Sequence, residues 1–505
     1  MEKIRVRFAP SPTGALHIGG IRTALYDYLF AKKNGGDFVL RIEDTDTSRY
    51  VEGAEDYILN ALEWCGIIPD ESPIKGGPYG PYRQSERRQI YDKYTQQILD
   101  SGNAYVAFDT PEELETLRKN HENKGEVFSY NYRTRKHLRN SLSLPEKEVK
   151  SLIEKKTPYV IRFKVPVDQT IHIRDWVRED FSVNTSMLDD KVLVKNDGMP
   201  TYHFAHVVDD HEMKISHVIR GEEWLPSLGL HLLLYEAMGW NPPEFAHLPL
   251  ILKPEGKGKL SKRDGDRLGF PVFPLTFTDP TTGSVSEGYR EKGYYPEAFT
   301  NFLVVLGWTP EGKEILSRQE MIEEFDLRKV HKSGARFSKK KALWYNQEYL
   351  QQKKDEELLV EFKKIPEVES GGYSDVSLLR IISLMKPRAV FVKDLYVQGS
   401  FFFRAPDRYD EKSAKKAWGE NSSDLLKDLL SLLPQTSPLC PEKIKTLLHS
   451  VVERHKTEPG KIMMPLRLAL VGELKGPDVP DIITIIGLER TLERIRHALE
   501  RIRVH

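Results

Sequence analysis

The chain has 505 residues, with 75 Lys and Arg against 75 Asp and Glu, so its formal net charge is zero. This length exceeds what one compact core usually holds, and we expect several domains. A hydrophobic fraction of 39% and a charged fraction of 30% are typical of a folded globular protein and exclude a disordered or fibrous chain. The charge balance provides no bulk attraction to nucleic acid, so any RNA contact must come from local basic patches.

Cysteine content and hydropathy indicate the cellular compartment in which the chain is expected. Only Cys65 and Cys440 occur, far apart, which argues against a disulfide framework or a thiolate zinc cluster and favours a reducing cytoplasm. The N-terminus lacks an apolar signal region, and no apolar run is long enough to cross a bilayer. We therefore predict a cytoplasmic protein without a membrane partner.

The first hundred residues alternate strand and helix patterns. Residues 4–8 alternate apolar and basic side chains, which predicts a strand, and apolar residues recur at helical spacing over 21–29. A second strand is expected over 38–42, and a second helix with one apolar face over 58–65. This succession is how a parallel nucleotide-binding sheet begins.

The middle of the chain has a different pattern. Residues 106–194 read as polar helices with short strands such as 159–165, which predicts a module inserted into the sheet domain. Strand patterns resume at 217–220 and 248–252. The stretch 269–296 is rich in Gly, Pro and aromatic residues and is predicted to be an ordered loop insertion.

Leucine-rich helical patterns dominate from about residue 342 onward. Examples are the leucines of 425–430 and the apolar residues of 444–451. The C-terminal third is therefore predicted to be entirely helical.

Two short motifs could serve phosphate chemistry. The segment 17–20 (HIGG) lies between the first strand and its helix, where main-chain N–H groups and the helix dipole attract phosphates. The segment 259–263 (KLSKR) is a basic cluster behind a later strand, where cations could neutralise developing pyrophosphate charge. Taken singly, the first is more often a turn and the second a solvated surface.

Together, HIGG shortly after APSPTG (9–14) and KLSKR far downstream resemble the two signature motifs of class I aminoacyl-tRNA synthetases. Further stretches are similar to the glutamyl and glutaminyl branch of that class. They are RIEDTD (41–46), GPYRQSER (80–87), PTYH (200–203), VVDDH (207–211) and VIRGEEW (218–224). By this resemblance the chain is identified as a member of the bacterial-type glutamyl-tRNA synthetases.

The resemblance implies an α/β architecture, with a Rossmann-type parallel-sheet catalytic domain, an inserted α+β module and an all-helical anticodon-binding region. The expected parts are a catalytic domain over 1–105 and 195–258, an acceptor-end-binding module over 106–194, a stem-contact domain over 259–345 and an anticodon-binding domain over 346–505.

The implied activity is ATP-dependent ligation of L-glutamate to tRNA(Glu) through glutamyl-adenylate. ATP with transient Mg²⁺ is the expected cofactor, and a monomer is the expected state. The family also implies that tRNA is required before glutamate is activated efficiently.

The resemblance also implies which side chains bind glutamate. Arg7 and Arg220, at strand ends, would hold carboxylates, which planar bidentate donors suit best. Glu43 would accept from the substrate ammonium. The remaining glutamate contacts are expected from Ala9, Ser11, Tyr202 and His206. Surface salt bridges are the alternative for Arg7 and Glu43.

The expected catalytic residues are His17, Gly19, Gly20, Lys259, Ser261 and Lys262. The expected ATP contacts are His17, Gly19, Gly20, Glu223, Leu250, Ile251, Lys259 and Lys262.

Many relatives have Asn where this chain has His206, so the detailed polar contacts of the pocket are open. No zinc or other metal site is predicted, because residues 104–109 hold no cysteine and the His and Asp residues of 203–211 match no zinc template.

Arg388 and Arg467 resemble residues with which the family reads the anticodon, and stacked arginine suits splayed bases. Surface arginine is an alternative of nearly equal weight.

Two related families are disfavoured by the helices predicted after residue 346. Glutaminyl-tRNA synthetases end in β-barrels, and a shorter enzyme that glutamylates a tRNA base lacks the C-terminal region. A non-catalytic relative should have lost His17, Gly19 or KLSKR. Whether tRNA(Gln) is also charged stays open, and Arg388 favours discrimination.

Overall fold

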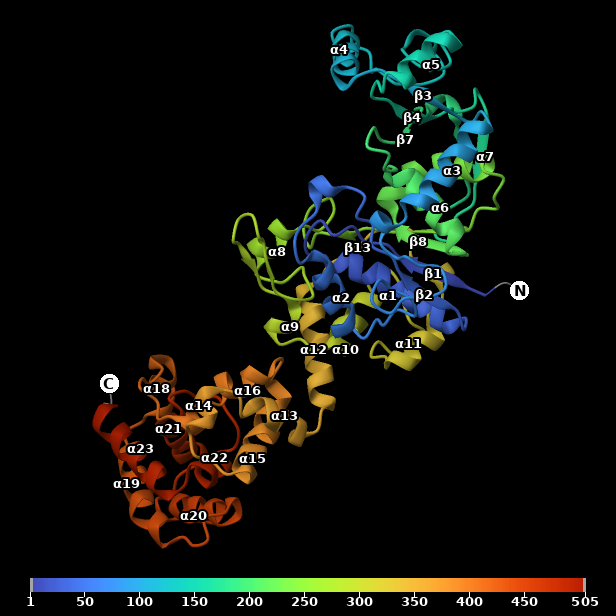
Figure 1. The fold of residues 1–505 in the computed structure, drawn as a ribbon. Helices are drawn as coiled ribbons and strands as arrows, with labels where there is room; N and C mark the ends of the chain where they lie inside the picture. The colour runs from blue at the N-terminus through green and yellow to red at the C-terminus, as the bar shows by residue number, and fades with distance from the viewer. Residues whose placement is uncertain (1–2, 503–505) are drawn as a thin grey trace. The chain divides into compact units, whose positions relative to one another are not determined.

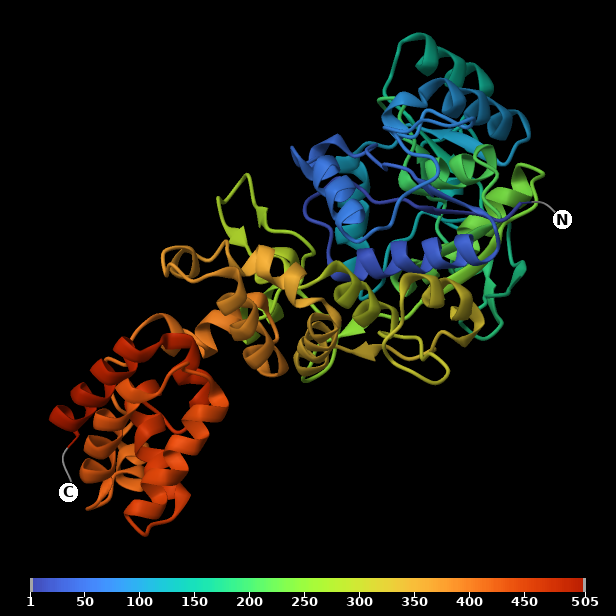
Figure 2. The same ribbon diagram turned by 90° about the horizontal axis from the view of Figure 1, so that it is seen from below.

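The computed structural model describes residues 3–502. The chain divides into two compact units, the first formed by residues 3–292 and 296–342 and the second by residues 293–295 and 343–502. Figures 1 and 2 show the first unit from blue to yellow and the second in orange and red.

Two parallel strand pairs form the centre of the first unit. The strands are β1 (Arg5–Phe8), β2 (Asp37–Leu40), β8 (His217–Gly221) and β9 (Glu244–Leu248). β1 pairs with β2 and β8 with β9, both in parallel. The main-chain N–H of Ser216 donates to the Arg5 oxygen at 2.9 Å, so β8 follows beside β1. The predicted parallel sheet is therefore confirmed.

Helix α1 (Ile18–Lys33) covers this sheet with a continuous buried face, because its apolar residues recur at helical spacing. Ile21, Leu25 and Leu29 are fully buried. Helices α10 (Pro296–Val304) and α11 (Arg318–Glu324) pack against α1, as both ribbon views show. α2 (Ala54–Trp64) buries Ile58 and Leu62, as the sequence pattern predicts.

Residues 104–194 form short strands and polar helices in the first unit. The elements are β3 (Ala104–Ala107), α4 (Pro111–Glu122), α5 (Glu146–Glu154), β4 (Val160–Phe163), β5 (Thr170–Ile173), β6 (Phe181–Asn184) and β7 (Val192–Val194). β4 pairs antiparallel with β3 and β7, and β5 with β6. Helices α3 (Arg88–Asp100), α6 (Tyr202–Glu212) and α7 (Leu228–Ala237) lie between this region and the central sheet in Figure 1.

The strand predicted over 248–252 is wrong in one respect. β9 ends at Leu248, and a separate strand β10 (Ile251–Leu252) pairs in parallel with β13 (Ala335–Arg336). Pro249 lies at the break, and proline cannot donate a main-chain hydrogen bond to a neighbouring strand. The break turns residues 249–251 towards the cleft described below.

The predicted loop insertion is ordered and contains short elements. Helix α8 (Lys262–Leu268) precedes it, and it includes β11 (Phe277–Thr278), β12 (Val285–Ser286) and α9 (Tyr289–Lys292). β11 and β12 form an antiparallel hairpin. The Tyr57 hydroxyl of α2 donates to the Leu275 oxygen at 2.6 Å and accepts from its N–H at 3.1 Å, which anchors the loop to the unit.

The second unit is helical in all its described elements, as predicted. α12 (Lys339–Gln352) leads into it, followed by α13 (Asp355–Phe362), α14 (Pro366–Glu369), α15 (Asp375–Met385), α16 (Val392–Gln398), α17 (Ser400–Phe403), α18 (Glu411–Ala417), α19 (Ser422–Leu432), α20 (Pro441–Arg454), α21 (Pro459–Val471), α22 (Val479–Ile486) and α23 (Leu488–Arg501). Leu425 and Leu429 of α19 and Ile444 of α20 join one buried apolar core.

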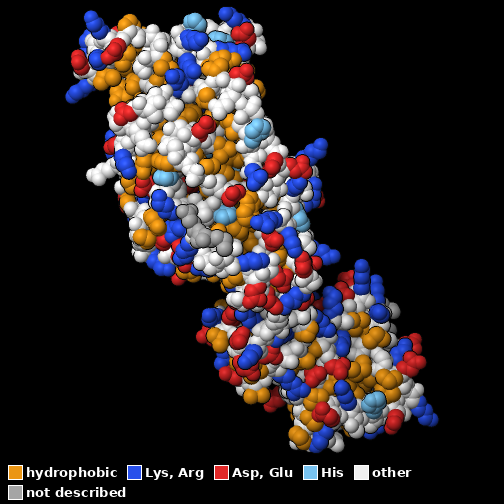
Figure 3. Space-filling view, turned by 90° about the vertical axis from the view of Figure 1, so that its right-hand side faces the viewer, with side chains coloured by type: hydrophobic (Ala, Val, Ile, Leu, Met, Phe, Trp, Pro, Cys, Tyr) orange, Lys and Arg blue, Asp and Glu red, His pale blue; other side chains and the backbone are white. Residues whose placement is uncertain are grey.

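The surface carries both charge signs, in keeping with the zero net charge. Figure 3 shows Lys and Arg interspersed with Asp and Glu over the face it presents. Among the described helices, none combines the length and apolarity that a membrane-crossing segment requires.

Candidate active site

A cleft of about 600 Å³ in the first unit brings together most of the predicted site residues. It lies at the carboxyl ends of β1 and β8 and at the N-terminus of α1, where ligands bind in open parallel α/β sheets. The predicted residues that line it are Arg7, Ala9, Ser11, His17, Gly19, Gly20, Glu43, Tyr202, His206, Arg220, Glu223, Leu250, Ile251 and Lys259.

His17 is the N-cap of α1 and has one free ring nitrogen. Its Nδ1 accepts the Gly19 main-chain N–H at 3.2 Å, so the ring proton belongs on Nε2. Burial, aided by the charge of Lys259, lowers the pKa of His17 to about 4, and the ring is neutral at pH 7. Nε2 is buried and has no hydrogen-bond partner within the described chain. It is therefore a neutral donor available to a ligand in the cleft.

The two glycines of the first turn of α1 have different surroundings. A Cβ on Gly19 would meet only His17 Nδ1, at 3.7 Å, which leaves its main chain open to an approaching ligand. A Cβ on Gly20 would lie 2.5 Å from Leu16 Cδ1. A side chain at Gly20 would therefore force the Leu16 side chain to move.

Arg7 and Glu43 belong to a buried charge network. Arg7 Nε donates to Asp210 Oδ1 at 3.0 Å, and Arg41 bridges Asp210 at 2.8 Å and Glu43 at 3.1 Å. Arg7 and Glu43 are 3% and 7% exposed, so the alternative of surface salt bridges is wrong. A second carboxylate, Asp209, anchors the network through Arg87 at 2.6 Å.

Burial sets the protonation of the two titratable groups beside Arg7. It raises the pKa of Glu43 to about 7, despite the opposing charges of Arg41 and Arg7. Burial and then the Arg7 charge hold the pKa of His206 well below its usual value, so the ring is neutral. His206 Nε2 lies 3.0 Å from Arg7 Nη2, and its Nδ1 lies 3.4 Å from Glu43 Oε1. Nε2 thus accepts from Arg7, and Nδ1 carries the proton that faces Glu43.

Lys259 closes one side of the cleft. Its Nζ pairs with Glu223 Oε1 at 3.0 Å, and both side chains are about half exposed. The main chain of Lys259 forms a single antiparallel β-bridge with Leu252, the last residue of β10, so the position of Lys259 depends on that strand. The ammonium group is accessible to an anionic ligand that would replace Glu223.

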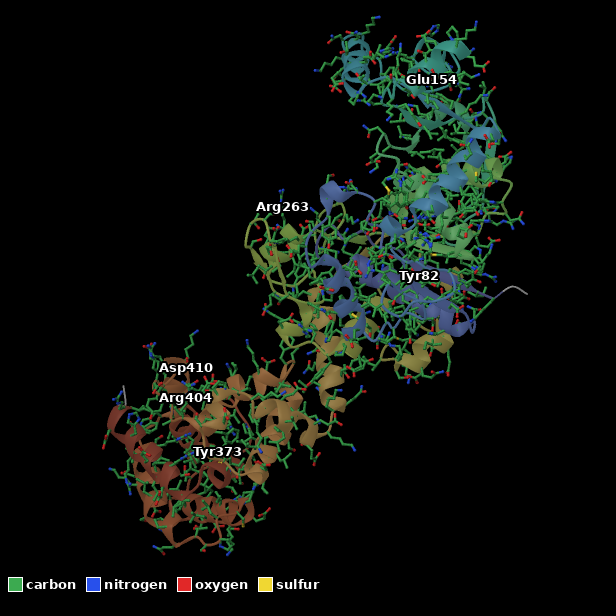
Figure 4. All side chains as sticks on the ribbon, viewed as in Figure 1. Tyr82, Glu154, Arg263, Tyr373, Arg404 and Asp410 are labelled. Carbon is green, nitrogen blue, oxygen red and sulfur yellow. The ribbon has the colours of Figure 1, made fainter. Side chains whose placement is uncertain are left out.

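The structure does not bring Ser261 and Lys262 into this cleft. Ser261 is the N-cap of α8, where its N–H donates to Asp264 Oδ2 at 3.0 Å. Lys262 lines an adjacent hollow of about 160 Å³ between α8 and residues 269–273. Arg263, labelled in Figure 4, is exposed on α8. The predicted roles of Ser261 and Lys262 therefore depend on ligand atoms that extend beyond the main cleft.

The two predicted anticodon residues lie in the second unit. Arg388 ends the short 3-10 helix Lys386–Arg388 and is exposed. Arg467 on α21 is half-buried, and its Nη1 donates to the Pro477 oxygen. Burial lowers the pKa of Arg467, and the charge of Arg388 contributes in the same direction. The two arginines are thus within electrostatic range of each other.

Sequence reasoning missed several residues around Arg220. Its Nε donates to His247 Nε2 at 3.0 Å, and Nη1 lies 3.3 Å from His231 Nδ1. Asp175 contacts His247 from the far side at 2.6 Å. Single histidines and a single aspartate in separate segments form no motif, so the only available signal was their position in or beside otherwise apolar runs.

Among residues 3–502 no group of three or more His, Cys, Asp or Glu side chains has a metal-binding arrangement. The expected absence of a structural zinc stays a prediction.

Comparison with known proteins identifies relatives over both units. The family model described as "tRNA synthetases class I (E and Q), catalytic domain" matches residues 3–344, and the one described as "Anticodon binding domain" matches residues 347–499. A glutamate–tRNA ligase of Christiangramia forsetii is 54% identical, with 99% of this chain and 100% of the relative covered. A glutamate–tRNA ligase of Flavobacterium johnsoniae is 53% identical, with 99% of each covered.

Two solved structures are similar over nearly the whole chain. The glutamate tRNA ligase of Elizabethkingia meningosepticum in complex with its amino acid superposes with a TM-score of 0.97 at 64% identity, covering 99% of this chain and 100% of that one. The glutamate-tRNA synthetase of Elizabethkingia anophelis has a TM-score of 0.95 at 65% identity, with the same coverage.

Proposed function

The chain belongs to the class I glutamyl-tRNA synthetases, and from this membership we propose how its cleft joins L-glutamate to tRNA with ATP. The reaction is the ATP-dependent ligation of L-glutamate to tRNA(Glu) through glutamyl-adenylate. The observation that carries the assignment of residues is one cleft that holds the buried guanidinium groups of Arg7 and Arg220, the buried carboxyl group of Glu43 and an open helix N-terminus.

Glutamate would bind at the end formed by Arg7, Arg220 and Glu43. The guanidinium groups suit the substrate carboxylates, because planar donors bind them bidentately. Glu43 suits the ammonium group, since its ionised form accepts hydrogen bonds and is stabilised by an adjacent positive charge. Ala9, Ser11, Tyr202 and His206 would complete the wall, and all four line the cleft.

ATP would bind with its phosphates at the N-terminus of α1. The free Nε2–H of His17 would donate to a phosphate oxygen, and the open main chain at Gly19 would let the phosphates approach the positive end of the helix dipole. Leu250 and Ile251 would contact the adenosine, and Glu223 and Lys259 lie at the same side of the cleft. Mg²⁺ would arrive as the counter-ion of ATP, because such ions are commonly held through substrate phosphates.

Activation would then proceed without a protein nucleophile. An α-carboxylate oxygen of glutamate attacks the α-phosphorus of ATP, the bond to the bridging oxygen breaks, and pyrophosphate leaves with that electron pair. Positioning of the phosphates by a hydrogen bond from neutral His17 and charge neutralisation by Lys259 and Lys262 would supply most of the acceleration. Ser261 would act by capping α8 beside Lys262.

Transfer completes the reaction. A terminal ribose hydroxyl of tRNA attacks the carbonyl carbon of glutamyl-adenylate, AMP leaves, and an ester forms. Residues 106–194 would bind the acceptor end, residues 259–345 the stem, and residues 346–505 the anticodon, with Arg388 and Arg467 as base readers. Residues 1–105 and 195–258 would hold the small substrates, and the chain would act as a monomer.

A glutaminyl-tRNA synthetase is the nearest rival. Such relatives are expected to end in β-barrels, whereas residues 343–502 contain helices and no strand. A non-catalytic derivative is disfavoured because His17, Gly19 and Lys259 remain and line the cleft.

Pyrophosphate exchange tests the proposal directly. We expect exchange of labelled pyrophosphate into ATP with glutamate, strongly increased by tRNA(Glu), and little with glutamine. Exchange with glutamine in place of glutamate would overturn the assignment. Exchange that is equally fast without tRNA would refute the tRNA requirement alone.

A further inference from the structure

Arg220 differs from Arg7 and Arg22, which also line the cleft, in what surrounds its guanidinium, since Arg22 donates to the main-chain oxygens of Leu306 and Pro249. Arg7 and Arg41 both pair with Asp210. Arg220 is only 5% exposed, yet it forms no ion pair with an Asp or Glu side chain anywhere in residues 3–502. Its hydrogen-bond partners are neutral acceptors: His247 Nε2, His231 Nδ1, His206 Nε2, Tyr202 Oη and the main-chain oxygen of Trp224. A buried cation without a countercharge is costly, so a ligand anion would find it largely desolvated already.

His247 connects Arg220 to a carboxylate that does not touch the guanidinium. Its Nδ1 lies 2.6 Å from Asp175 Oδ2, and both side chains are completely buried. Asp175 Oδ1 also accepts the main-chain N–H groups of Val177 and Arg178, which fixes the carboxylate in place. Because Nδ1 keeps the ring proton and donates it to Asp175 in a hydrogen bond, Nε2 has a lone pair and can accept from Arg220.

His231 forms a second arm of the same kind. A guanidinium cannot accept a hydrogen bond, so His231 Nδ1, at 3.3 Å from Arg220, must present a lone pair. The proton then belongs on Nε2, which faces His203 Nδ1 at 3.1 Å. Burial and then the Arg220 charge hold the pKa of His231 well below its usual value, and burial lowers that of His203 to about 4. Both rings are neutral at pH 7.

We propose that His231 and His247 are positioning residues that hold Arg220 through imidazole lone pairs alone, which keeps its positive charge free for the substrate. The inference rests on the proposed function. Glutamate carries one more negative charge than glutamine, and Arg220 pairs with no protein carboxylate, whereas Arg7 at the same end of the cleft pairs with Asp210. A carboxylate in place of either imidazole would pair with Arg220 and remove the preference for glutamate over glutamine, because charge pairs at short range are strong where water is excluded.

Paired substitutions separate this role from a merely structural one. H231N and H247Q keep an acceptor near the ring nitrogen that faces Arg220, whereas H231L and H247L remove it. In pyrophosphate exchange with tRNA, we expect the leucine variants to raise the KM for glutamate by about tenfold or more, as loss of a buried hydrogen bond to a charge does. The KM for ATP should stay within about twofold. The acceptor variants should restore the KM for glutamate to within about threefold of the unsubstituted chain.

The variant H231D tests the charge itself. We expect the ratio of kcat/KM for glutamate over glutamine to fall by about tenfold or more. H211L is the matched control, because His211 stacks on Trp240 at a ring-centroid distance of 3.8 Å and does not line the cleft. It should leave kcat/KM unchanged for glutamate and for glutamine. Equal effects of the leucine and acceptor variants, or an unchanged ratio in H231D, would overturn the proposal.

The tautomers give a readout that needs no activity. In the unsubstituted chain with nitrogen-15-labelled histidine at pH 7, we expect His247 as the Nδ1–H form and His231 as the Nε2–H form. A cationic ring at either position would contradict the inference. Failure of the unsubstituted chain to activate glutamate would instead count against the proposed function, so the two failures are distinguishable.

Discussion

His17 uses its two ring nitrogens for different purposes. Nδ1 accepts the Gly19 N–H and caps α1, which leaves Nε2–H without a protein partner and, in our proposal, free for the phosphates of ATP. H17N should keep the cap and lose the donor, whereas H17Q should place an amide donor near the Nε2 position. We expect H17N to lower kcat for pyrophosphate exchange by about 100- to 1,000-fold, with little change in the KM for glutamate. H17Q should retain more activity, and a larger loss in H17Q than in H17N would contradict the assignment.

The proposed contact of Glu43 with the substrate ammonium predicts that glutamate binding depends on pH. Burial raises its pKa to about 7 in the free cleft, so it is mostly protonated below that pH. The substrate ammonium favours the ionised carboxylate, and binding therefore releases a proton below pH 7. We expect the KM for glutamate to rise by up to about tenfold per unit as pH falls below 7, and to level off above it. Measurement between pH 5.5 and 8.5 checks this.

The control for the pH dependence of the KM for glutamate is E43Q, because a glutamine side chain cannot ionise. Its KM should be high and nearly independent of pH over the same interval. A profile in E43Q that follows that of the unsubstituted chain would show that another group is responsible.

The sequence predicted the glutamate pocket better than it predicted the supports of that pocket. Glu43 lies within a motif and Arg7 lies at a strand end, so the sequence predicted both, and both line the cleft. Asp175, His231 and His247 come from three separate segments and meet only in the folded chain. Their tautomers depend on distances and burial that no spacing encodes.

At the scale of elements, the loop after α8 depends on Gly288. A Cβ there would lie 2.1 Å from the Leu275 carbonyl carbon and 2.4 Å from Thr276 N, which are main-chain atoms that cannot rotate away. G288A should therefore separate the hairpin from α2, at a cost of about 1–3 kcal/mol. We expect faster limited proteolysis within residues 271–288 than in the unsubstituted chain. G419A is the control, since a Cβ on Gly419 meets nothing within 4 Å, and equal cleavage of both variants would refute the explanation.

Helices were predictable where one apolar face recurs over several turns. Ile21, Leu25 and Leu29 of α1 are buried as their spacing requires, and so are Leu425, Leu426 and Leu429 of α19. The strand over 248–252 was not predicted correctly, because an apolar run does not reveal that Pro249 divides it. The short strands of the loop insertion lack enough residues for any periodic signal.

At the scale of the whole molecule, the proposed chemistry and the proposed reading of tRNA fall in different units. All lining residues of the cleft belong to the first unit, and Arg388 and Arg467 belong to the second. Selectivity for an amino acid can therefore change through Arg220 and its histidines without any change in the second unit. Selectivity for tRNA should change independently.

Arg388 is where that independence is tested. It is exposed at the end of a short helix, and loss of a stacked or hydrogen-bonded arginine from a single-stranded base costs about 1–3 kcal/mol. We expect R388A to raise the KM for tRNA(Glu) by about 5- to 150-fold while the KM for glutamate at saturating tRNA stays within about twofold.

R388Q should also bring the charging rates of tRNA(Glu) and tRNA(Gln) closer together, because glutamine lacks the positive charge with which Arg388 donates to a base. R496A removes another exposed arginine of the second unit and should change neither constant. If R388A and R496A behave alike, Arg388 contributes only general surface charge, and the discriminating role belongs to other residues of the helical unit.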